Sequence, residues 1–286
     1  KWIMYYKFHS LLSPAKLNIG LKITGKRDDG YHLLKSIFCL IDMCDIIDIQ
    51  ITDNHKISLI EHNQAWFYQK DLAYKAAKLL QDYSKTQFGT NIRIKKTIPS
   101  GAGMGGGSSN AATVLIILNQ LWSINLSTPE LAQLGVQLGA DVPFFIYGKN
   151  SLVEGIGEII TPIELPKLYF VIIKPDIHIP TKEIFTNLNY SNENNVISHS
   201  TQELLNNKEN DLEFIARRLY PNLEQLFNEL SQYQEFGTPV MTGSGSCIYF
   251  TFYDKKIAET LANNLKIKYN IYLAASLTES TVSNCV

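Results

Sequence analysis

The sequence predicts an α+β fold, because strand and helix patterns follow one another without the regular strand–helix–strand rhythm of a doubly wound sheet. Its 286 residues are enough for one large domain or two medium ones with a substantial core. Hydrophobic residues make up 45% of the chain and charged residues 19%, the balance of a soluble globular protein. We expect a domain boundary near residues 161–167, which separates residues 1–163 from residues 164–286.

The N-terminal part begins with strand patterns. Residues 17–23 alternate between apolar and polar, residues 26–30 favour a turn, and residues 37–51 are rich in β-branched side chains. Apolar residues then follow helical spacing at 72–83, and a further strand is expected at 92–98. That strand leads directly into a glycine-rich segment.

Helices are expected after the glycine-rich segment. Apolar residues share one helix face at 114–122. Ser127 and Glu130 form a capping box, and the helix that it starts should end near Gly139. Because Val142 precedes a proline, we expect an extended backbone there.

The C-terminal part mixes one strand pattern with several helical ones. Residues 168–173 are a candidate buried strand, and residues 187–211 are rich in Asn and Ser, which predicts an exposed and partly mobile connection. Helical spacing returns at 212–219 and again after Pro221. Residues 248–252 are typical of a strand.

The charge balance argues against two classes of partner. The net charge is −1 and the pI is about 6.7, so we expect neither nucleic acid nor an anionic membrane as the main partner. No apolar run reaches the ~18 residues that a membrane span needs. The four cysteines form no CxxC pair, which predicts reduced thiols, no zinc site and a cytoplasmic location. We expect the protein to be a monomer or a homodimer.

The strongest chemical signal is a segment that contains five glycines within seven residues, from Gly101 to Gly107. Glycines allow backbone N–H groups to approach an anion closely, and a helix N-terminus directly afterwards favours phosphate. We therefore expect a phosphate-binding loop formed by Pro99, Ser100, Gly101, Ala102, Gly103, Met104, Gly105, Gly106, Gly107, Ser108 and Ser109.

Two familiar phosphate motifs do not describe this loop. A Walker A motif needs a lysine before its Ser or Thr, and here Gly107 precedes Ser108 directly. A dinucleotide fingerprint can be written onto Gly101, Gly103 and Gly106, but the acid ~20 residues further on is already the capping-box residue Glu130. A dinucleotide oxidoreductase is therefore disfavoured.

Several motifs together resemble those of the GHMP kinases, over nearly the whole chain from about Ser13 onward. They are the glycine loop and the sequences Ser13-Pro-Ala-Lys-Leu-Asn18, Gly139-Ala-Asp141-Val-Pro143 and Thr242-Gly-Ser-Gly245. Within this superfamily, the first motif, Gly30-Tyr31-His32 and the run after Gly139 are most similar to the 4-diphosphocytidyl-2-C-methyl-D-erythritol kinases of the non-mevalonate isoprenoid pathway.

The resemblance implies a fold, a reaction and its cofactors. The N-terminal, ATP-binding domain should resemble ribosomal protein S5, the C-terminal, substrate-binding domain should be ferredoxin-like, and the active site should lie between them. ATP, with Mg²⁺, should phosphorylate the 2-hydroxyl of a small molecule that carries a cytidine diphosphate group. No protein ligand to the metal is assigned.

The resemblance also gives roles to individual residues. Asp141 is the expected general base and Lys16 the expected catalytic cation, since phosphoryl transfer needs an oriented, deprotonated hydroxyl and charge neutralisation. Substrate binding is expected from Asn18, Tyr31, His32, Thr181 and Phe185, with the aromatic rings around the cytosine.

The chain departs from the family pattern at a few positions, and alternatives stay open. Met104 stands where Leu is usual, Ser100 where an apolar residue is frequent, and Asp71 where Asn is usual beside the expected adenine site. Another GHMP kinase, of the mevalonate-pathway or homoserine type, would share the ATP site. A non-catalytic RNA-binding module of the S5-like fold is a further alternative, which Lys16, Asp141 and the charge balance disfavour.

Overall fold

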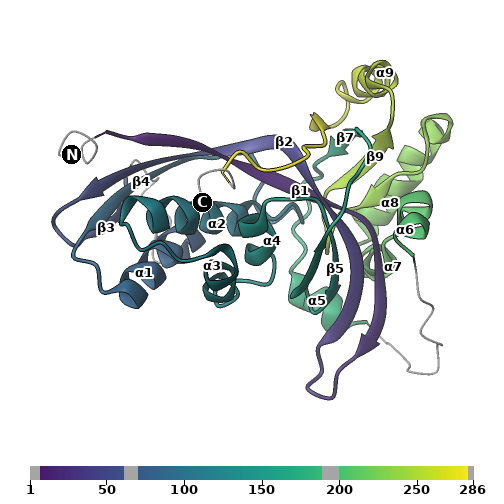
Figure 1. The fold of residues 1–286 in the computed structure, drawn as a ribbon. Coiled ribbons are helices and arrows are strands. Elements are labelled where there is room, and N and C mark those ends of the chain that lie inside the picture. The colour runs from purple at the N-terminus through teal and green to yellow at the C-terminus, as the bar shows by residue number, and fades with distance from the viewer. Residues whose placement is uncertain (1–6, 61–69, 189–199, 283–286) are drawn as a thin grey trace.

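The computed structural model describes residues 7–60, 70–188 and 200–282. Two sheets stand side by side and a long hairpin crosses between them (Figure 1). The first sheet has strand order β3-β4-β2-β5-β6, with β1 paired to β2. Its strands are β1 (His9–Lys26), β2 (His32–Thr52), β3 (Ile57–Leu59), β4 (Gly89–Lys95), β5 (Ser151–Gly155) and β6 (Ile159–Pro162).

Four helices pack on the first sheet and bury its apolar face. They are α1 (Leu72–Ser84), α2 (Gly106–Leu121), α3 (Thr128–Gly135) and α4 (Val142–Tyr147). Helix α2 is buried along most of its length, because its apolar side chains meet both the sheet and the neighbouring helices. The predicted strands and helices of this part are present, and the strand predicted at 92–98 ends earlier, at Lys95.

The second sheet is antiparallel in the order β10-β7-β9-β8. Its strands are β7 (Tyr169–Ile173), β8 (Val240–Met241), β9 (Ile248–Phe252) and β10 (Ile271–Ala275). The helical segments of this part are α5 (Thr181–Thr186), α6 (Thr201–Asn207), α7 (Asp211–Leu219), α8 (Pro221–Leu230), the 3-10 helix η3 (Ser231–Phe236) and α9 (Lys255–Leu265).

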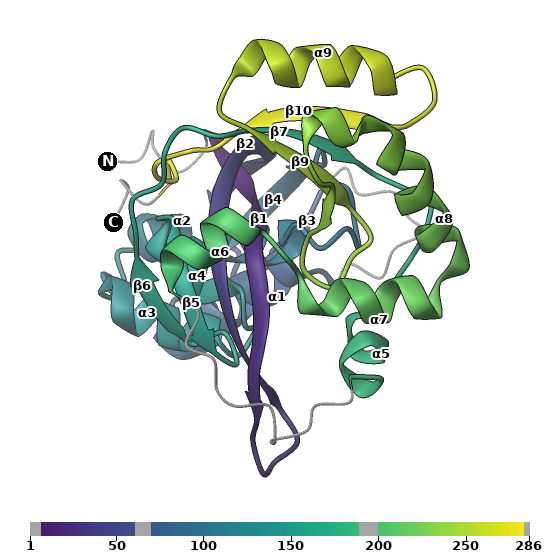
Figure 2. The same cartoon turned by 90° about the vertical axis from the view of Figure 1, so that its right-hand side faces the viewer.

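Both faces of the second sheet are covered, and side-chain alternation along its strands explains how. Val171 and Phe250 pack with α7, α8 and α9, which lie around the sheet in Figure 2. Phe170 and Tyr249 point to the opposite face and pack against Leu17 on β1. The β1–β2 hairpin thereby belongs to both cores and fixes one sheet against the other.

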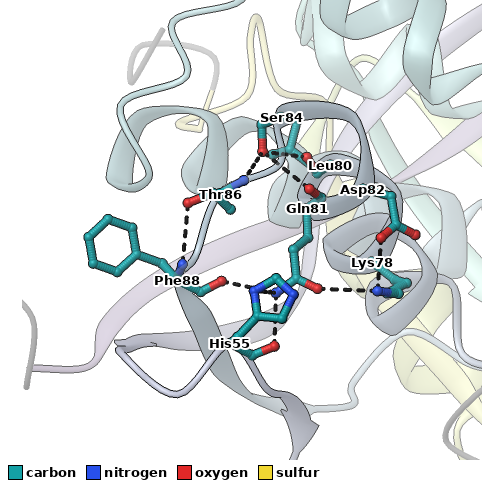
Figure 3. A network of polar contacts seen from close by, with 8 residues as sticks. All are labelled: His55, Lys78, Leu80, Gln81, Asp82, Ser84, Thr86 and Phe88. Carbon is teal, nitrogen blue, oxygen red and sulfur yellow. Dashed lines mark hydrogen bonds and ion pairs between the residues drawn. The ribbon is translucent and has the colours of Figure 1, made fainter.

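Helix α1 is anchored at its C-terminal end by a buried glutamine (Figure 3). The side-chain N–H₂ of Gln81 donates to the carbonyl oxygens of His55 at 3.1 Å and Phe88 at 2.9 Å, which lie just before β3 and β4. A buried amide with two partners holds its neighbours rigidly, because breaking either bond would leave a polar group unsatisfied. The opposite end of α1 lies at the candidate site.

Three local expectations about the backbone are wrong. The capping box of Ser127 and Glu130 forms, but the helix ends at Gly135 and not near Gly139. Gly135 packs closely on α4, because a Cβ there would come within 2.8 Å of the Val142 side chain, and the chain turns at this contact. Val142 is the first residue of helix α4 and is not extended, since a proline fits the first turn of a helix.

The third correction concerns residues 187–211. Residues 189–199 lie outside the described residues, but α6 follows from a capping box of Ser200 and Glu203, and it packs on β1.

No helix within residues 7–60, 70–188 and 200–282 is long and apolar enough to cross a membrane.

Candidate active site

The glycine-rich loop joins β4 to α2 and has the backbone that its sequence requires. Gly101, Gly103 and Gly105 have φ values of +64°, +75° and +70°, a region that side chains rarely adopt. A Cβ on Gly103 would lie 2.3 Å from the carbonyl oxygen of Thr242. Glycine is therefore needed there both for the backbone angle and for the close approach of the loop of residues 242–246.

A cavity of about 640 Å³ lies over this loop and the N-terminus of α2. Ten of the predicted loop residues line it, Pro99 to Ser108, together with Asp71, Lys96, Asn110 and Thr181 among others. Ser109 does not line it, since its buried hydroxyl lies 2.8 Å from that of Ser13. The cavity thus offers backbone N–H groups at the start of a long helix, which is a favourable environment for phosphate.

Lys96 brings a positive charge to this cavity. Its ammonium pairs with Asp45, which is fully buried and also accepts hydrogen bonds from the backbone N–H groups of Thr97 and Ile98 at 2.7 and 2.8 Å. These bonds end strand β4 before residue 97. A Cβ on Gly106 would lie 3.5 Å from the Lys96 Nζ, so the cation stands beside the first turn of α2.

Lys16 and Asp141 meet next to the glycine loop. Lys16 lies on β1, where its backbone N–H donates to the carbonyl of Met104 at 3.0 Å. Its Nζ lies 3.7 Å from Asp141 Oδ2 and donates to Asn18 Oδ1 at 2.5 Å. Asp141 is the residue before α4, and its side chain is 31% exposed, whereas that of Lys16 is 4% exposed. The carboxylate is therefore accessible while the ammonium is held in place.

Burial changes the titration of this lysine. Desolvation lowers the pKa of Lys16, and the negative charge of Asp141 opposes the shift. The ammonium also lies 4.5 Å from the centre of the Phe38 ring. A lysine so enclosed acts as a fixed charge, because few other arrangements are open to it.

A smaller hollow, of about 250 Å³, adjoins Lys16 and Asp141. Asn18, Thr181, Phe185 and Ser244 also line it, and Gly103 and Thr181 line the larger cavity as well. The Thr181 and Ser244 hydroxyls lie 2.7 Å apart. An acceptor in the small hollow would therefore meet phosphates from the glycine loop beside Asp141.

Two of the three predicted aromatic residues lie together. The rings of His32 and Phe185 have centroids 5.9 Å apart at an interplanar angle of 31°. Burial and the charge of Lys26 lower the pKa of His32. A hydrogen bond with the backbone of Leu188 acts in the opposite direction and raises this pKa. His32 Nε2 is buried and has no partner in the part of the chain that the structure describes. Tyr31 is 60% exposed in the turn before β2.

A larger groove, of about 710 Å³, lies elsewhere, between β1, α7 and α8. Most of its charged residues form pairs with one another: Lys22 with Glu209 and Asp211, and Arg217 with Glu213 and Glu224. Arg218 also lines the groove and donates to the carbonyl oxygen of Asn187 at 3.5 Å. Such pairs satisfy each other and give no pattern of converging reactive groups. The glycine-loop cavity and the hollow beside it are the better candidate for an active site.

Comparison with known proteins agrees with this geometry. Residues 71–149 match the model of the GHMP kinases N-terminal domain, and residues 197–271 match that of the GHMP kinases C-terminal domain. A 4-diphosphocytidyl-2-C-methyl-D-erythritol kinase from Haemophilus ducreyi is 46% identical over 255 residues, 88% of this chain and 89% of the relative. One from Neisseria meningitidis serogroup A is 41% identical over 93% of this chain and 94% of its own length.

The chain belongs to the GHMP kinase family. A solved 4-(cytidine 5′-diphospho)-2C-methyl-D-erythritol kinase superposes with a TM-score of 0.79 and 29% identity, over 94% of this chain and 99% of that one. The homoserine kinase from Cytophaga hutchinsonii shares the fold with a TM-score of 0.70 at 15% identity, over 96% of this chain and 95% of its own. The predicted α+β GHMP kinase fold is confirmed; the boundary between residues 163 and 164 stays a prediction.

The structure adds residues to this GHMP kinase site that the sequence analysis did not single out. They are Lys96, which lines the cavity, and Asp45, which pairs with it from a segment far away in the chain. The pair Lys95-Lys96 at the end of a strand before a glycine loop is a usable signal, since cations favour phosphate sites. Asp45 gave no signal, because its partners, the Lys96 ammonium and the backbone N–H groups of Thr97 and Ile98, are brought to it only by the fold.

Proposed function

We propose that this GHMP kinase transfers the γ-phosphoryl group of ATP to the 2-hydroxyl of 4-diphosphocytidyl-2-C-methyl-D-erythritol, in the non-mevalonate isoprenoid precursor pathway. The observation that carries the proposal is the identity of 41–46% to kinases of this name over 88–93% of the chain. The site geometry supports each part of the reaction in turn.

The glycine loop binds the ATP phosphates. Backbone N–H groups of residues 101–107 and the N-terminus of α2 supply donors, and Lys96 supplies a charge beside Gly106. Asp71 lines the same cavity and caps α1, because its carboxylate accepts the backbone N–H of Ala73 at 2.8 Å. That contact fixes the start of α1 beside the adenine.

Asp141 accepts the proton of the attacking hydroxyl. As the hydroxyl oxygen forms its bond to the γ-phosphorus, the bond from that phosphorus to the bridging oxygen breaks, and ADP leaves with the electron pair. The partly exposed carboxylate of Asp141 borders the hollow in which the hydroxyl is placed. Lys16 stabilises the negative charge that develops between the acceptor and the phosphate, and Asn18 holds its ammonium in place.

The cytosine lies between aromatic rings at the start of β2 and on α5. His32 and Phe185 provide one wall, and Tyr31 contributes a further ring from the adjacent turn. Since its pKa is lowered, His32 is neutral at pH 7 and one of its ring nitrogens can accept a hydrogen bond. Its Nε2 is buried and has no partner among the described residues, so a movement of the ring that exposed this atom would let it accept a hydrogen bond from the exocyclic amino group of cytosine. Thr181 and Ser244 bind polar groups of the acceptor.

The residues present fit a magnesium ion held mainly by ATP. The described residues contain no group of three His, Cys, Asp or Glu side chains that could cage a metal. Mg²⁺ commonly binds through substrate phosphates with one or two protein ligands. The Ser108 hydroxyl, half-buried at the start of α2, would be one such ligand. When bound, the ion would neutralise phosphate charge.

ADP release measured with a panel of acceptors tests this function. We expect turnover with the cytidyl substrate and little with mevalonate or homoserine, which other GHMP kinases use. Mass spectrometry of the product should show one added phosphoryl group. Turnover with mevalonate or homoserine, and none with the cytidyl substrate, would assign the chain to a different branch of the family.

A further inference from the structure

Asn210 holds the backbone of the loop of residues 242–246, although it lines neither cavity of the candidate site. It is buried and stands at the N-cap of α7, where its Oδ1 accepts the backbone N–H of Leu212 at 2.9 Å. Its Nδ2 donates to the carbonyl oxygens of Met241 at 2.7 Å and Gly243 at 2.8 Å. The Asn210 side-chain amide therefore forms hydrogen bonds with the backbone on both sides of Thr242.

Thr242 passes this restraint to the active site. It is fully buried, and its hydroxyl accepts the backbone N–H of Asn18 at 3.1 Å and donates to Asn18 Oδ1 at 3.4 Å. The same Oδ1 accepts from Lys16 Nζ at 2.5 Å, and that ammonium faces Asp141 at 3.7 Å. A continuous polar chain thus runs from α7 through the loop to the two catalytic residues.

The loop also sets the spacing of the phosphate site. The Thr242 carbonyl lies so close to Gly103 that a Cβ there would be 2.3 Å away. A shift of Thr242 would therefore displace both the glycine loop and Asn18. Misplacement of reacting groups by about 1 Å can cost about 100-fold in rate, which makes the position of such a loop matter to catalysis.

We propose that Asn210 is a positioning residue for phosphoryl transfer: through Thr242 and Asn18 it fixes the ammonium of Lys16 beside Asp141. The inference rests on the proposed kinase function. The competing view is that Asn210 only caps α7 and so contributes to stability alone. The two views differ in what happens when the cap is kept and the side-chain N–H₂ is lost.

Two substitutions make this separation. Asn210→Asp keeps the shape and an equally good cap, but it sets a carboxylate oxygen against the two carbonyls. Asn210→Ser keeps a capping hydroxyl that is too short to reach them. The variants are made in the full chain, and kcat is divided by the fraction of protein that binds an ATP analogue in calorimetry, so that unfolded protein is not counted. We expect both variants to lose about tenfold or more in kcat, with a smaller change in KM.

Asp254→Ala is the matched control. Asp254 caps α9 in the same way, accepting the backbone N–H of Lys256 at 2.7 Å, and its own side chain is exposed. Its loss should lower the melting temperature and leave kcat unchanged. If Asn210→Asp and Asn210→Ser behave like this control, the positioning role is wrong.

A double-mutant cycle with Thr242→Val tests the route. This nearly isosteric change removes the hydroxyl that contacts Asn18. If Asn210 acts through it, Asn210→Ser should lower kcat much less in the Thr242→Val background than in wild type. Full additivity would overturn the proposal. The wild-type protein in the same assay distinguishes failure of the proposed kinase function from failure of the positioning role. If the wild type does not turn over the cytidyl substrate, the proposed function is wrong; if only the variants behave other than expected, the positioning role is wrong.

Discussion

The Nζ of Lys16 lies 3.7 Å from Oδ2 of Asp141, and the two residues come from elements that meet only in the folded chain, strand β1 and the start of α4. The lysine is buried while the aspartate remains partly exposed. This asymmetry suits their proposed roles, because a base must reach the substrate and a fixed charge need not move.

Replacing Asp141 by Asn should lower kcat by roughly 10²–10⁴-fold, because the amide keeps the shape but cannot accept a proton. Affinity for ATP should change little, since the phosphates bind to the glycine loop. Steady-state kinetics and calorimetry with an ATP analogue measure the two quantities. Asp82→Asn, on the exposed side of α1, serves as the control, and a kcat for Asp141→Asn within a few-fold of wild type would exclude it as the base.

As the pH rises, kcat should begin to fall at a lower pH than the pKa of an exposed lysine would give. Burial lowers the pKa of Lys16, so rising pH removes its proton, and with it the stabilising charge, at a lower pH than for an exposed lysine. The pH dependence of kcat measures this alkaline limb. Lys16→Arg, which stays charged, should not show it if it retains activity, and a flat wild-type profile up to the usual lysine range would argue against the assignment.

Lys16→Met should depress kcat strongly, because the substitution removes a charge that acts mainly in the transition state. Circular dichroism distinguishes this effect from unfolding. A folded Lys16→Met variant with normal turnover would end the catalytic assignment of this residue.

Gly103→Ala should abolish ATP binding, because its Cβ would collide with the Thr242 carbonyl at 2.3 Å and would stand on a backbone with φ of +75°. Gly237→Ala is the control for an alanine on a backbone of positive φ outside the site, since Gly237 has φ of +118° and nothing within 4 Å of its added Cβ. Calorimetry should show lost affinity for an ATP analogue in the first variant only. Normal affinity in Gly103→Ala would place the phosphates elsewhere.

Tyr31→Ala should cost about 1–3 kcal/mol in kcat/KM for the cytidyl substrate, the range found for contacts between a base and an aromatic ring. Tyr83→Ala is the control, because Tyr83 is similarly exposed, at 56% against 60%, but lies on α1. Equal kcat/KM values for the two variants would remove Tyr31 from the cytidine site.

Much of the fold could be predicted from local pattern. The apolar spacing of α1 and the β-branched residues of β2 and β7 determine these elements by themselves, and the glycine loop is recognisable because the residue type is the signal. Helix α6 was missed although Ser200 and Glu203 form a capping box, since the polar composition of the surrounding segment outweighed it.

The rest depends on contacts between distant segments. The end of β4 follows from the buried carboxylate of Asp45, which takes the N–H groups of the next residues, and the end of α3 follows from packing at Gly135. Lys16 and Asp141 could be placed together only through the family resemblance. No local pattern could indicate that Asn210 holds the backbone around Thr242.

The ratio of kcat/KM for the cytidyl substrate to that for its uridyl analogue tests the proposed substrate most directly. Cytosine carries an amino donor where uracil carries a carbonyl acceptor, and a neutral His32 whose Nε2 has no partner among the described residues favours the donor. We predict a preference of roughly 10-fold or more for the cytidyl substrate, largely lost in His32→Phe. Equal kcat/KM for both bases in the wild-type protein would contradict a cytidine-reading acceptor site.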